Sequence, residues 1–266
     1  MNIRNWTRAK IGSWARQLLA KRGYLVQRTS KLLIEHPESI LHMNFNFAMA
    51  RHMMEIDGHK ITFIQVGAFD GKTNDPLYPY IQRYHWRGVL LEPEPQAFSQ
   101  LQQTYHDEPQ LTLMNCALTD RDGPANLYRI QPGVDGMPDW SRQIATLDVD
   151  TLRRHQDGVP AYGIQGGIKD IDRWIECIQV EGISFDHLLD LMGTSTIDLL
   201  QIDAEGYDGH IIQRFPFKRV QPSLIHYEHM HLCSTDQEAC LAILISQGYR
   251  IAVDFADTLA VRKETQ

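Results

Sequence analysis

Three short hydrophobic runs in the sequence each end at a carboxylate, and these acids are Glu92, Asp203 and Glu228. In an open α/β sheet, ligands bind at the carboxyl ends of the strands. Buried strands rarely end in unpaired carboxylates, because removing a charge from water is costly. Three acids at the same edge of a sheet therefore predict a ligand site, although each acid alone could be a helix N-cap or a surface residue.

A glycine-bearing turn follows another hydrophobic run, and the whole stretch reads ITFIQVGAFDG over residues 61–71. Its first half is rich in β-branched and aromatic residues, as expected of a parallel strand that is covered on both faces. Gly67 lets the backbone turn sharply and lets a ligand approach where a Cβ atom would block it. A strand, a glycine turn and a helix form the nucleotide-binding corner of a doubly wound sheet, although many α/β proteins use such a turn for structure alone.

Glu92 strengthens the prediction of a nucleotide site. It follows the glycine turn by roughly 20 or more positions and ends the second strand, where an acid can accept hydrogen bonds from a ribose diol. Pro93 and Pro95 then close the strand and open a helix, since proline is well tolerated in a first helical turn. The turn lacks the GxGxxG pattern, which disfavours an NAD-dependent oxidoreductase.

The residues around the other two acids include candidates for a general base, namely Asp203, Glu205, Glu228 and His229. We favour His229 or Asp203, because a histidine titrates near neutral pH. His229 could also be an ordinary loop histidine, which is what we expect of His231. A divalent metal on Asp203, Glu228 and His229 is disfavoured, because no spaced motif such as HExxH appears, and we expect no bound metal.

The hydrophobic patterning predicts an alternation of helices and strands around these residues. Helices are expected at residues 76–84, 96–105, 183–191 and 235–247 and from residue 209, and strands at residues 61–66, 87–91, 111–117, 125–130, 198–203 and 222–228. Residues 249–255 and 258–262 should form a closing hairpin. Ser184 is placed to cap the helix that follows it.

Residues 131–175 differ in character, because glycines and prolines interrupt them repeatedly. A long irregular insertion in a compact domain is usually a lid or a substrate loop. Trp140, Arg142, Tyr162 and Trp174 could line a polar substrate there. The alternative, and the better interpretation for any one aromatic residue, is that it pins the loop down.

The first 34 residues contain eight Arg and Lys residues and no acid. Apolar residues recur among them at helical spacing, which predicts a basic amphipathic helix. Such a helix could contact an anionic membrane or a partner enzyme, or it could pack on the domain and leave its charges in water. A second helix is expected at residues 39–54, so we divide the chain into an N-terminal helical extension, residues 1–57, and a catalytic domain, residues 58–266.

The composition bounds the class of protein. The chain has 266 residues, 43% of them hydrophobic, which is enough for one sizeable α/β core. No apolar run approaches the ~20 residues of a membrane span, and no secretory signal is present. The four cysteines are scattered along the chain. We therefore expect a reduced, cytoplasmic protein, with the inner face of the membrane as a possible peripheral location. The net charge of -7 leaves an acidic body, which argues against a nucleic-acid substrate.

The motifs VGAFDG, LLEPEP, NCAL, LLQIDAEGYD, IHYEHMHL and DTLA, in this order, resemble those of the FkbM family of S-adenosylmethionine-dependent methyltransferases. The resemblance covers residues from about Phe63 to Arg262, and the insertion matches only loosely. One departure is Phe69, where the family often has asparagine. The resemblance implies an α/β fold of the class I methyltransferase type, with a seven-stranded mixed sheet, helices on both faces and an antiparallel last strand.

The resemblance also implies a function, which is transfer of a methyl group to a hydroxyl, commonly on a sugar, a glycolipid or a secondary metabolite. It assigns the methionine part of S-adenosylmethionine to the turn after the first strand and the ribose to Glu92 with Pro93. It places Asp203 between donor and acceptor, as a residue that also binds the cofactor. The cofactor-binding residues expected in the turn and at the adenine edge are Val66, Gly67, Ala68, Asp70, Gly71, Asn74, Asn115, Cys116 and Ala117. A catalytically inactive binding protein on the same fold is the main alternative.

Overall fold

The computed structural model describes residues 30–56, 60–154, 156, 167–194, 196–254 and 256–263. The chain divides into two units, residues 1–37 and residues 38–266. In the first unit, helix α2 (Lys31–Glu35) begins after Ser30, whose side chain accepts a hydrogen bond from the backbone N–H of Leu33. Most of the expected basic amphipathic helix, residues 1–29, lies outside the described residues. The 3-10 helix η1 (Pro37–Ser39) follows α2 along the chain.

A seven-stranded mixed sheet forms the centre of the second unit, with the strand order β10-β11-β9-β8-β1-β2-β3. Its strands are β1 (Thr62–Val66), β2 (Arg87–Leu91), β3 (Leu111–Met114), β8 (Leu199–Ile202), β9 (Leu224–Glu228), β10 (Tyr249–Val253) and β11 (Asp257–Arg262). Neighbouring strands from β3 to β9 are parallel, whereas β11 runs antiparallel to both β9 and β10. The expected sheet, with its antiparallel last strand, is confirmed.

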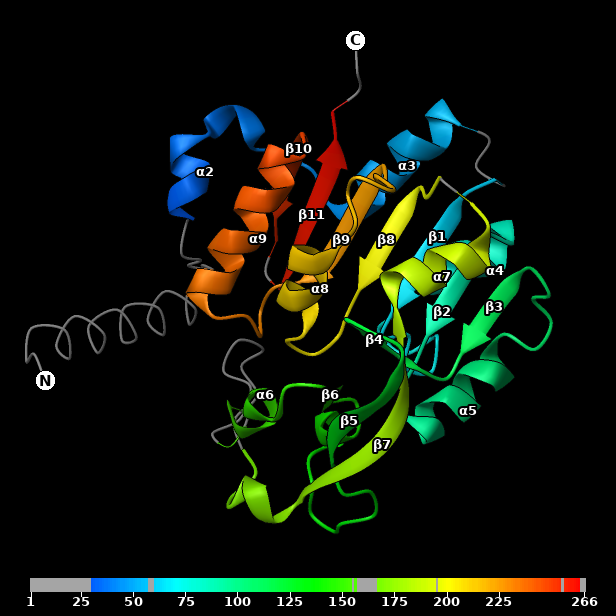
Figure 1. Cartoon of the computed structure of the whole chain (residues 1–266), viewed down its shortest axis with the longest axis vertical. Helices are drawn as coiled ribbons and strands as arrows, with labels where there is room; N and C mark the ends of the chain where they lie inside the picture. The colour runs from blue at the N-terminus through cyan, green and yellow to red at the C-terminus, as the bar shows by residue number, and fades with distance from the viewer. Residues whose placement is uncertain are drawn as a thin grey trace, which may run out of the picture. The chain divides into compact units, whose positions relative to one another are not determined.

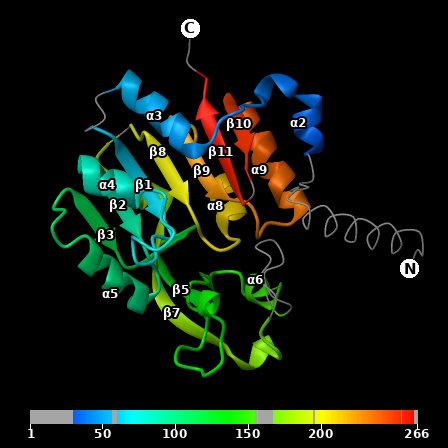
Figure 2. The ribbon, with the colours of Figure 1, turned by 180° about the vertical axis from the view of Figure 1, so that it is seen from behind.

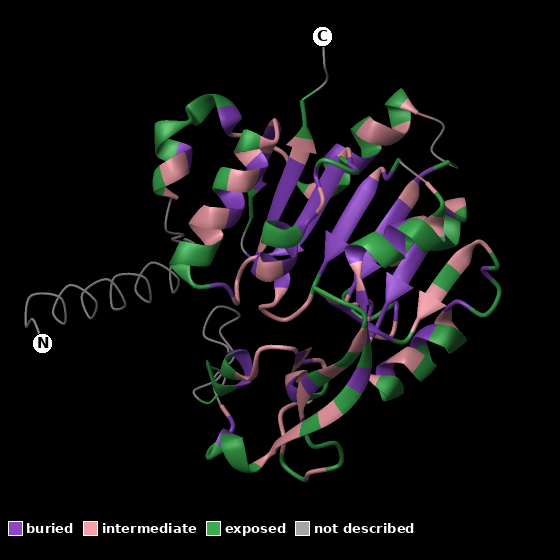
Figure 3. Ribbon diagram, in the orientation of Figure 1, coloured by how far each residue is buried: buried purple, intermediate pink, exposed green. Residues whose placement is uncertain are grey.

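Helices cover both faces of this sheet. On one face lie α7 (Phe185–Met192), α8 (Asp208–Arg214) and α9 (Ser234–Ser246) (Figure 1). On the other face lie α3 (Phe45–Glu55), α4 (Tyr78–Tyr84) and α5 (Pro95–Thr104) (Figure 2). The central strands are therefore buried almost throughout their length (Figure 3). Their near-continuous hydrophobicity follows from this double cover.

Local sequence explains where two of these helices begin. The side chain of Asn44 accepts a hydrogen bond from the backbone N–H of Phe47 and caps α3, and Ser184 caps α7 in the same way, as expected. Helix α3, which the sequence placed in the N-terminal extension, contributes Ala48 and Met49 to the core of the second unit. Just before it, Ile40 forms an isolated parallel bridge with Ile251 of β10.

A second, four-stranded sheet has the order β4-β7-β5-β6. Its strands are β4 (Ala117–Thr119), β5 (Gly123–Ile130), β6 (Ala145–Thr146) and β7 (Ile175–Ser184). The single strand expected at residues 111–117 is therefore wrong, because β3 ends at Met114 and β4 belongs to the other sheet. The long strand β7 had no counterpart in the prediction. One of its faces is exposed, so its apolar residues alternate with polar ones and form no continuous run.

The connection from β5 to β7 corresponds to the expected insertion at residues 131–175. Its described part holds the 3-10 helices η2 (Asp139–Arg142) and η5 (Ile171–Arg173), strand β6 and helix α6 (Val149–Arg154). Tyr162, which was expected to line a substrate, lies outside the described residues.

Gly88 of β2 provides a test of how tightly this core is packed. It lies directly opposite Phe63 of β1, and a Cβ atom at Gly88 would lie 2.4–2.6 Å from three atoms of the buried Phe63 ring. We expect Gly88→Ala to lower the free energy of unfolding by about 1–3 kcal/mol, because overpacking forces the ring to move. The measurement is urea denaturation.

The control is the double variant, Gly88→Ala with Phe63→Leu. A smaller side chain at residue 63 makes room for the new methyl group, so the glycine substitution should cost less in this background than in the wild type. Equal costs in the two backgrounds would show that the ring does not constrain Gly88.

Candidate active site

The turn after β1 is held between its two neighbouring strands. The backbone N–H groups of Gly67 and Ala68 both donate to the carbonyl oxygen of Leu91 on β2, at 3.0 Å. On the other side, a Cβ atom at Gly67 would lie 1.8 Å from the backbone oxygen of Asp203, and Gly67 has a φ of 76°. Close approach and a left-handed backbone both require glycine here. The turn therefore lies tightly between the ends of β2 and β8.

Two of the predicted turn residues form hydrogen bonds that stabilise the loop. Asp70 accepts hydrogen bonds from the backbone N–H groups of Lys72 and Thr73 through one carboxylate oxygen. The carbonyl oxygen of Gly71 accepts a hydrogen bond of 2.8 Å from the hydroxyl of Tyr105, the C-cap residue of α5. Neither Asp70 nor Gly71 is among the described residues that line the cavity at this edge. Their predicted contact with a cofactor stays a prediction.

Glu92 is buried at the end of β2, with 5% of its surface exposed. Its two carboxylate oxygens accept hydrogen bonds from the backbone N–H groups of Phe69 and Glu94, both at 2.7 Å. Phe69 donates from a left-handed conformation, with a φ of 46°, which asparagine adopts more readily than phenylalanine does. Burial raises the pKa of Glu92 to about 7, although these N–H groups act in the opposite direction.

Asn115, a predicted contact of the adenine edge, has a supporting position in the structure. Its side-chain amide donates to the carbonyl oxygens of Glu92 and Pro93, at 2.8 and 3.2 Å. It is not among the described residues that line the cavity, whereas Cys116 and Ala117 are. Asn115 therefore fixes the backbone that presents Glu92.

A row of polar side chains crosses the three central strands, and sequence reasoning missed it. Gln65, Gln201 and His226 are paired in register across β1, β8 and β9, and all three line the cavity. His226 Nδ1 lies 2.8 Å from the Gln201 side-chain oxygen, and burial lowers the pKa of His226 to about 4, so it is neutral. The side-chain oxygen of Gln65 is buried without a hydrogen-bond partner. The available signal was one polar residue within each otherwise apolar strand.

The ends of β8 and β9 bring three predicted acids together, since Asp203, Glu205 and Glu228 all line the cavity. Burial is the main cause that raises the pKa of each of these carboxyls. The charge of Asp203 raises the pKa of Glu205 and Glu228 further, and the charge of Asp208 does the same for Asp203. The fully buried Asp208 shapes the turn between them, because its carboxylate accepts hydrogen bonds from the backbone N–H groups of Ala204 and Gly206, at 3.2 and 3.0 Å.

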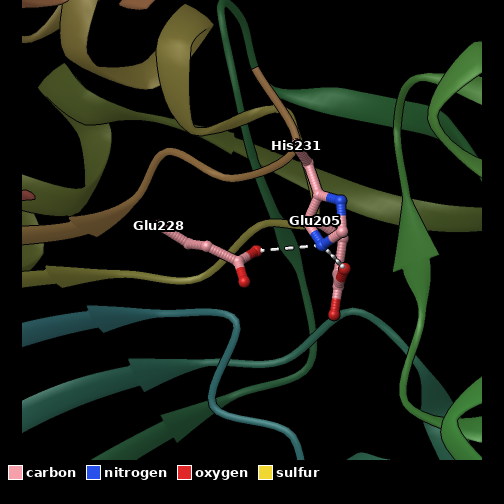
Figure 4. A group of neighbouring side chains, drawn as sticks. All are labelled: Glu205, Glu228 and His231. Atoms are coloured by element: carbon pink, nitrogen blue, oxygen red, sulfur yellow. Dashed lines mark ion pairs between the residues drawn. The ribbon is translucent and has the colours of Figure 1, made fainter. Parts of the chain in front are cut away.

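The two histidines after β9 have different surroundings. His229 Nδ1 lies 3.0 Å from the hydroxyl of Thr258, and His229 is not among the described cavity-lining residues. His231 lines the cavity, and its Nε2 lies 3.3 Å from carboxylate oxygens of both Glu205 and Glu228 (Figure 4). The structure thus brings His231, rather than the favoured His229, to the predicted acids.

These residues surround one cavity with a volume of about 640 Å³. Val66, Gly67, Ala68 and Asn74 line it at the turn after β1, and Glu92 and Pro93 at the end of β2. The opposite wall comes from residues 140–147 of the insertion and includes Trp140 and Arg142. Trp140 also packs beside a small core of Ile130, Ile168 and Ile171, and so does Trp174, the other described candidate from this insertion, which does not line the cavity.

Glu92 makes a pH dependence measurable. Its pKa of about 7 in the folded protein exceeds its ordinary value of 4.5, so the folded state binds more protons than the unfolded state between these values. The resulting stabilisation is fully present below pH 4.5 and is lost as the pH rises through 7. We expect the cofactor-free protein to lose up to about 3 kcal/mol more than Glu92→Gln across this window, as measured by urea denaturation at each pH.

The matched control is Glu55→Gln, which changes a half-exposed carboxylate at the end of α3. It should keep the pH dependence of the wild type. Parallel stability curves for the wild type and Glu92→Gln would contradict the pKa assigned to Glu92.

Comparison with known proteins gives a family match. A family model described as the methyltransferase FkbM domain matches residues 65–251. No curated protein matches the chain. Among solved structures, a methyltransferase FkbM from Methylobacillus flagellatus KT shares 15% identity at a TM-score of 0.45, and the match covers 76% of this chain and 44% of that protein. The chain therefore spans less than half the length of that protein.

Two further solved structures are similar to the chain at lower identity. An O-methyltransferase from Bacillus cereus in complex with SAH shares 8% identity at a TM-score of 0.38, and the match covers 93% of this chain and 97% of that one. Aeropyrum pernix fibrillarin with natively bound S-adenosyl-L-methionine shares 11% identity at a TM-score of 0.36, with coverages of 77% and 68%.

The cavity fits the cofactor of the matched family. The unpartnered Gln65 oxygen can accept a hydrogen bond from an amino group or a hydroxyl, and Glu92 retains lone pairs for a ribose diol. Gly67 and Ala68 of the turn line the same cavity. Because the family model matches more than half of the chain, the protein belongs to the methyltransferase FkbM domain family, whose cofactor is S-adenosylmethionine.

Proposed function

We propose that the protein transfers the methyl group of S-adenosylmethionine to a hydroxyl oxygen of a small molecule or glycan, such as a sugar, a glycolipid or a secondary metabolite. The observation that carries the proposal is that one cavity joins the glycine turn and Glu92 to a group of buried carboxylates and to a wall from the insertion. A donor can lie at the first part and an acceptor at the second.

The donor half follows from the residues at the turn and at the end of β2. Glu92 is the proposed partner of the ribose diol, because its position is fixed by two backbone N–H groups and its oxygens can accept further hydrogen bonds. Gln65 is proposed to accept from the amino group of the methionine part, since its buried oxygen otherwise lacks a partner. Cys116 and Ala117 are proposed to border the adenine.

For methyl transfer, the protein must position the acceptor oxygen and remove its proton. When bound, S-adenosylmethionine supplies a methyl carbon that is bonded to a positively charged sulfur. The protein must hold the acceptor oxygen in line with that bond, which is worth up to ~7–11 kcal/mol in favourable cases. A hydroxyl is a weak nucleophile, so a base that accepts its proton adds ~10²–10⁴-fold. Asp203 is the proposed base, because it follows β8 directly and lines the cavity beside the turn.

The acceptor half is proposed to lie against residues 140–147 of the insertion. Arg142 offers a guanidinium that can donate to hydroxyl or anionic groups, and Trp140 offers an indole face on which an apolar sugar face can pack. Both residues lie in η2. The residue types in this wall therefore support a polar acceptor.

The basic N-terminal segment has a separate proposed role. Residues 1–34 carry eight positive charges and no acid, which suits contact with an anionic membrane surface or a partner enzyme. No helix within the described ranges combines the length and the apolarity that crossing a membrane requires. A cytoplasmic location and the absence of a nucleic-acid partner stay predictions from the sequence.

Gly67 gives a test of the donor half. Gly67→Ala places a Cβ atom 1.8 Å from the oxygen of Asp203, so we expect the turn to shift and the binding of S-adenosylhomocysteine to weaken at least tenfold. The control is Gly133→Ala, because Gly133 has nearly the same φ, 77°, but nothing within 4 Å of the added atom. It bears the backbone strain alone and should keep wild-type affinity in isothermal titration calorimetry. Unchanged affinity in Gly67→Ala would remove the turn from the cofactor site.

The reaction itself can be tested with a donor labelled in its methyl group. We expect label to enter small hydroxyl compounds or glycans in a form that resists alkali, because a methyl ether survives conditions that release a methyl ester as methanol. Asp203→Asn should lower kcat/KM by ~10²–10⁴-fold with little change in S-adenosylhomocysteine affinity, since asparagine keeps the shape and an acceptor oxygen of the side chain but cannot act as the base.

Asp107→Asn serves as the control for Asp203→Asn, because Asp107 has an 84% exposed side chain and is not among the described cavity-lining residues. It should keep wild-type activity. Label that alkali releases would show that the protein methylates a carboxyl group and not a hydroxyl group. A wild type that binds the donor but transfers no methyl group would favour a binding protein.

A further inference from the structure

Glu205, Glu228 and His231 converge from three segments of the chain. Glu205 lies in the turn after β8, Glu228 ends β9, and His231 lies in the loop that precedes α9. Each residue offers one ligand atom, and these atoms all lie within 4.8 Å of one another. Figure 4 shows the two carboxylates on either side of the imidazole edge that carries Nε2.

The distances within this cluster suit a shared ligand better than direct hydrogen bonds. His231 Nε2 lies 3.3 Å from Oε2 of Glu205 and 3.3 Å from Oε2 of Glu228. A charge-assisted N–H···O hydrogen bond is shorter, at about 2.7–2.9 Å. Bonds of ~2.0–2.2 Å to a small divalent cation would place neighbouring ligand atoms about 3.0–3.5 Å apart. Both separations from His231 Nε2 match the edges of such a coordination shell.

Two buried oxygen atoms in the cluster have no hydrogen-bond partner. Oε2 of Glu205 and Oε2 of Glu228 are both buried, and their ion pairs with His231 Nε2 at 3.3 Å do not meet hydrogen-bond geometry. The side chains of Glu228 and His231 are each 10% exposed, and that of Glu205 is 18% exposed. An unpaired buried carboxylate oxygen is costly, so a cation among these atoms would offset a penalty that the protein otherwise bears.

The charge of the cavity also favours a cation. Seven carboxyl side chains line it within the described part of the chain, and Arg142 is the one described lysine or arginine that does so. Burial and the neighbouring charge of Asp203 both raise the pKa of Glu205 and Glu228, which is the response expected where compensating positive charge is lacking. A bound cation would reverse this response and keep both carboxylates ionised.

The backbone around the cluster is fixed in the ligating arrangement. Glu205 has a φ of 50°, an uncommon conformation for a residue with a side chain. At the next residue, a Cβ atom on Gly206 would lie 2.6 Å from the hydroxyl oxygen of Thr151 and 3.3 Å from Cβ of His231. The guanidinium of Arg154 donates to the backbone oxygen of His231 at 3.3 Å. Helix α6 therefore holds both loops of the cluster in place.

We propose that Glu205, Glu228 and His231 bind one divalent first-row cation, such as Mn²⁺ or Zn²⁺. Two carboxylates and one imidazole form a mixed oxygen and nitrogen donor set that these ions accept, and three protein ligands leave positions open for water or substrate. This site departs from the expectation of no bound metal. That expectation relied on the absence of a compact motif, whereas these ligands come from two loops and a strand end.

The role of the cation rests on the proposed function, whereas the site itself does not. The cavity position of the cluster allows an acceptor hydroxyl to occupy an open coordination position, where the cation lowers the pKa of the hydroxyl. Glu205 and Glu228 are then occupied as ligands. Asp203 remains as the carboxylate that takes the proton.

Metal binding can be measured on the full chain without cofactor or acceptor, so its failure is distinct from failure of methyl transfer. After treatment with a chelator, the protein is titrated with Mn²⁺ while the electron paramagnetic resonance signal of the free ion is recorded. We expect one site per chain and at least tenfold weaker binding in Glu228→Gln and in Glu205→Gln. Thermal denaturation with Mn²⁺ or Zn²⁺ should show a stabilisation of the wild type that both variants lose.

Asp257→Asn is the matched control, because it removes a carboxylate of the same cavity that lies outside the cluster. It should bind Mn²⁺ with an affinity within a few-fold of the wild type. A loss of affinity equal to that of Glu228→Gln would mean that the cation responds only to the general negative charge of the cavity, which would overturn the proposed site. Electron spin echo spectra of the wild type with Mn²⁺ provide a readout that needs no variant. Coupling to a ¹⁴N nucleus supports His231 as a ligand, and its absence, or a failure of the wild type to bind, would falsify the proposal.

Discussion

The contact between Gly67 and the backbone oxygen of Asp203 sets the geometry of the whole site. A side chain at residue 67 would overlap that oxygen, so β1 and β8 can end side by side only with glycine at the turn. The N–H of Asp203 donates to the oxygen of Val66 at 2.9 Å, and the turn is bonded on its other side to Leu91. Strands β2, β1 and β8 therefore end at one level, and Glu92 and Asp203, the acids that follow β2 and β8, line the same cavity.

Burial of charge is handled in two ways within this space. At Glu92, backbone N–H groups from both flanking turns satisfy the carboxylate oxygens, so the side chain is held rigidly although it is desolvated. At Glu205 and Glu228, the backbone provides no such donors to the oxygens that face His231. The first arrangement suits recognition of hydroxyl donors, and the second suits a positively charged ligand. A single edge of the sheet thus carries two electrostatically different halves.

The sequence predicted the central sheet well because buried parallel strands leave a strong one-dimensional signal. The runs before Gly67, Glu92 and Asp203 are nearly all apolar, and each became a strand that ends where expected to within a residue or two. Strand β7 left no such signal, since one of its faces is exposed and its partner β5 is far away in sequence. The second sheet could therefore not be predicted from local patterning.

The side chains of the site were harder to predict than the strands that carry them. His229 and His231 are two residues apart, and only the path of the backbone decides between them: the N–H of His229 donates to Ala256, which directs this residue towards β11. Asn115 and Asp70 were predicted to contact the cofactor, but in the structure their side chains form hydrogen bonds with neighbouring backbone groups. Whether a polar side chain lines the cavity or supports the backbone beside it depends on three-dimensional packing.

The neck of the insertion has an evolutionary consequence. Ile130 pairs with Ile175, and the N–H of Gln131 donates to the oxygen of Trp174, so the two ends of the excursion are clamped together where it leaves the second sheet. The entropic cost of closing a loop grows only slowly with its length once the ends are joined. Lineages can therefore lengthen, shorten or replace this segment while the cofactor scaffold stays intact, which makes the neck a natural exchange point for acquiring new acceptors.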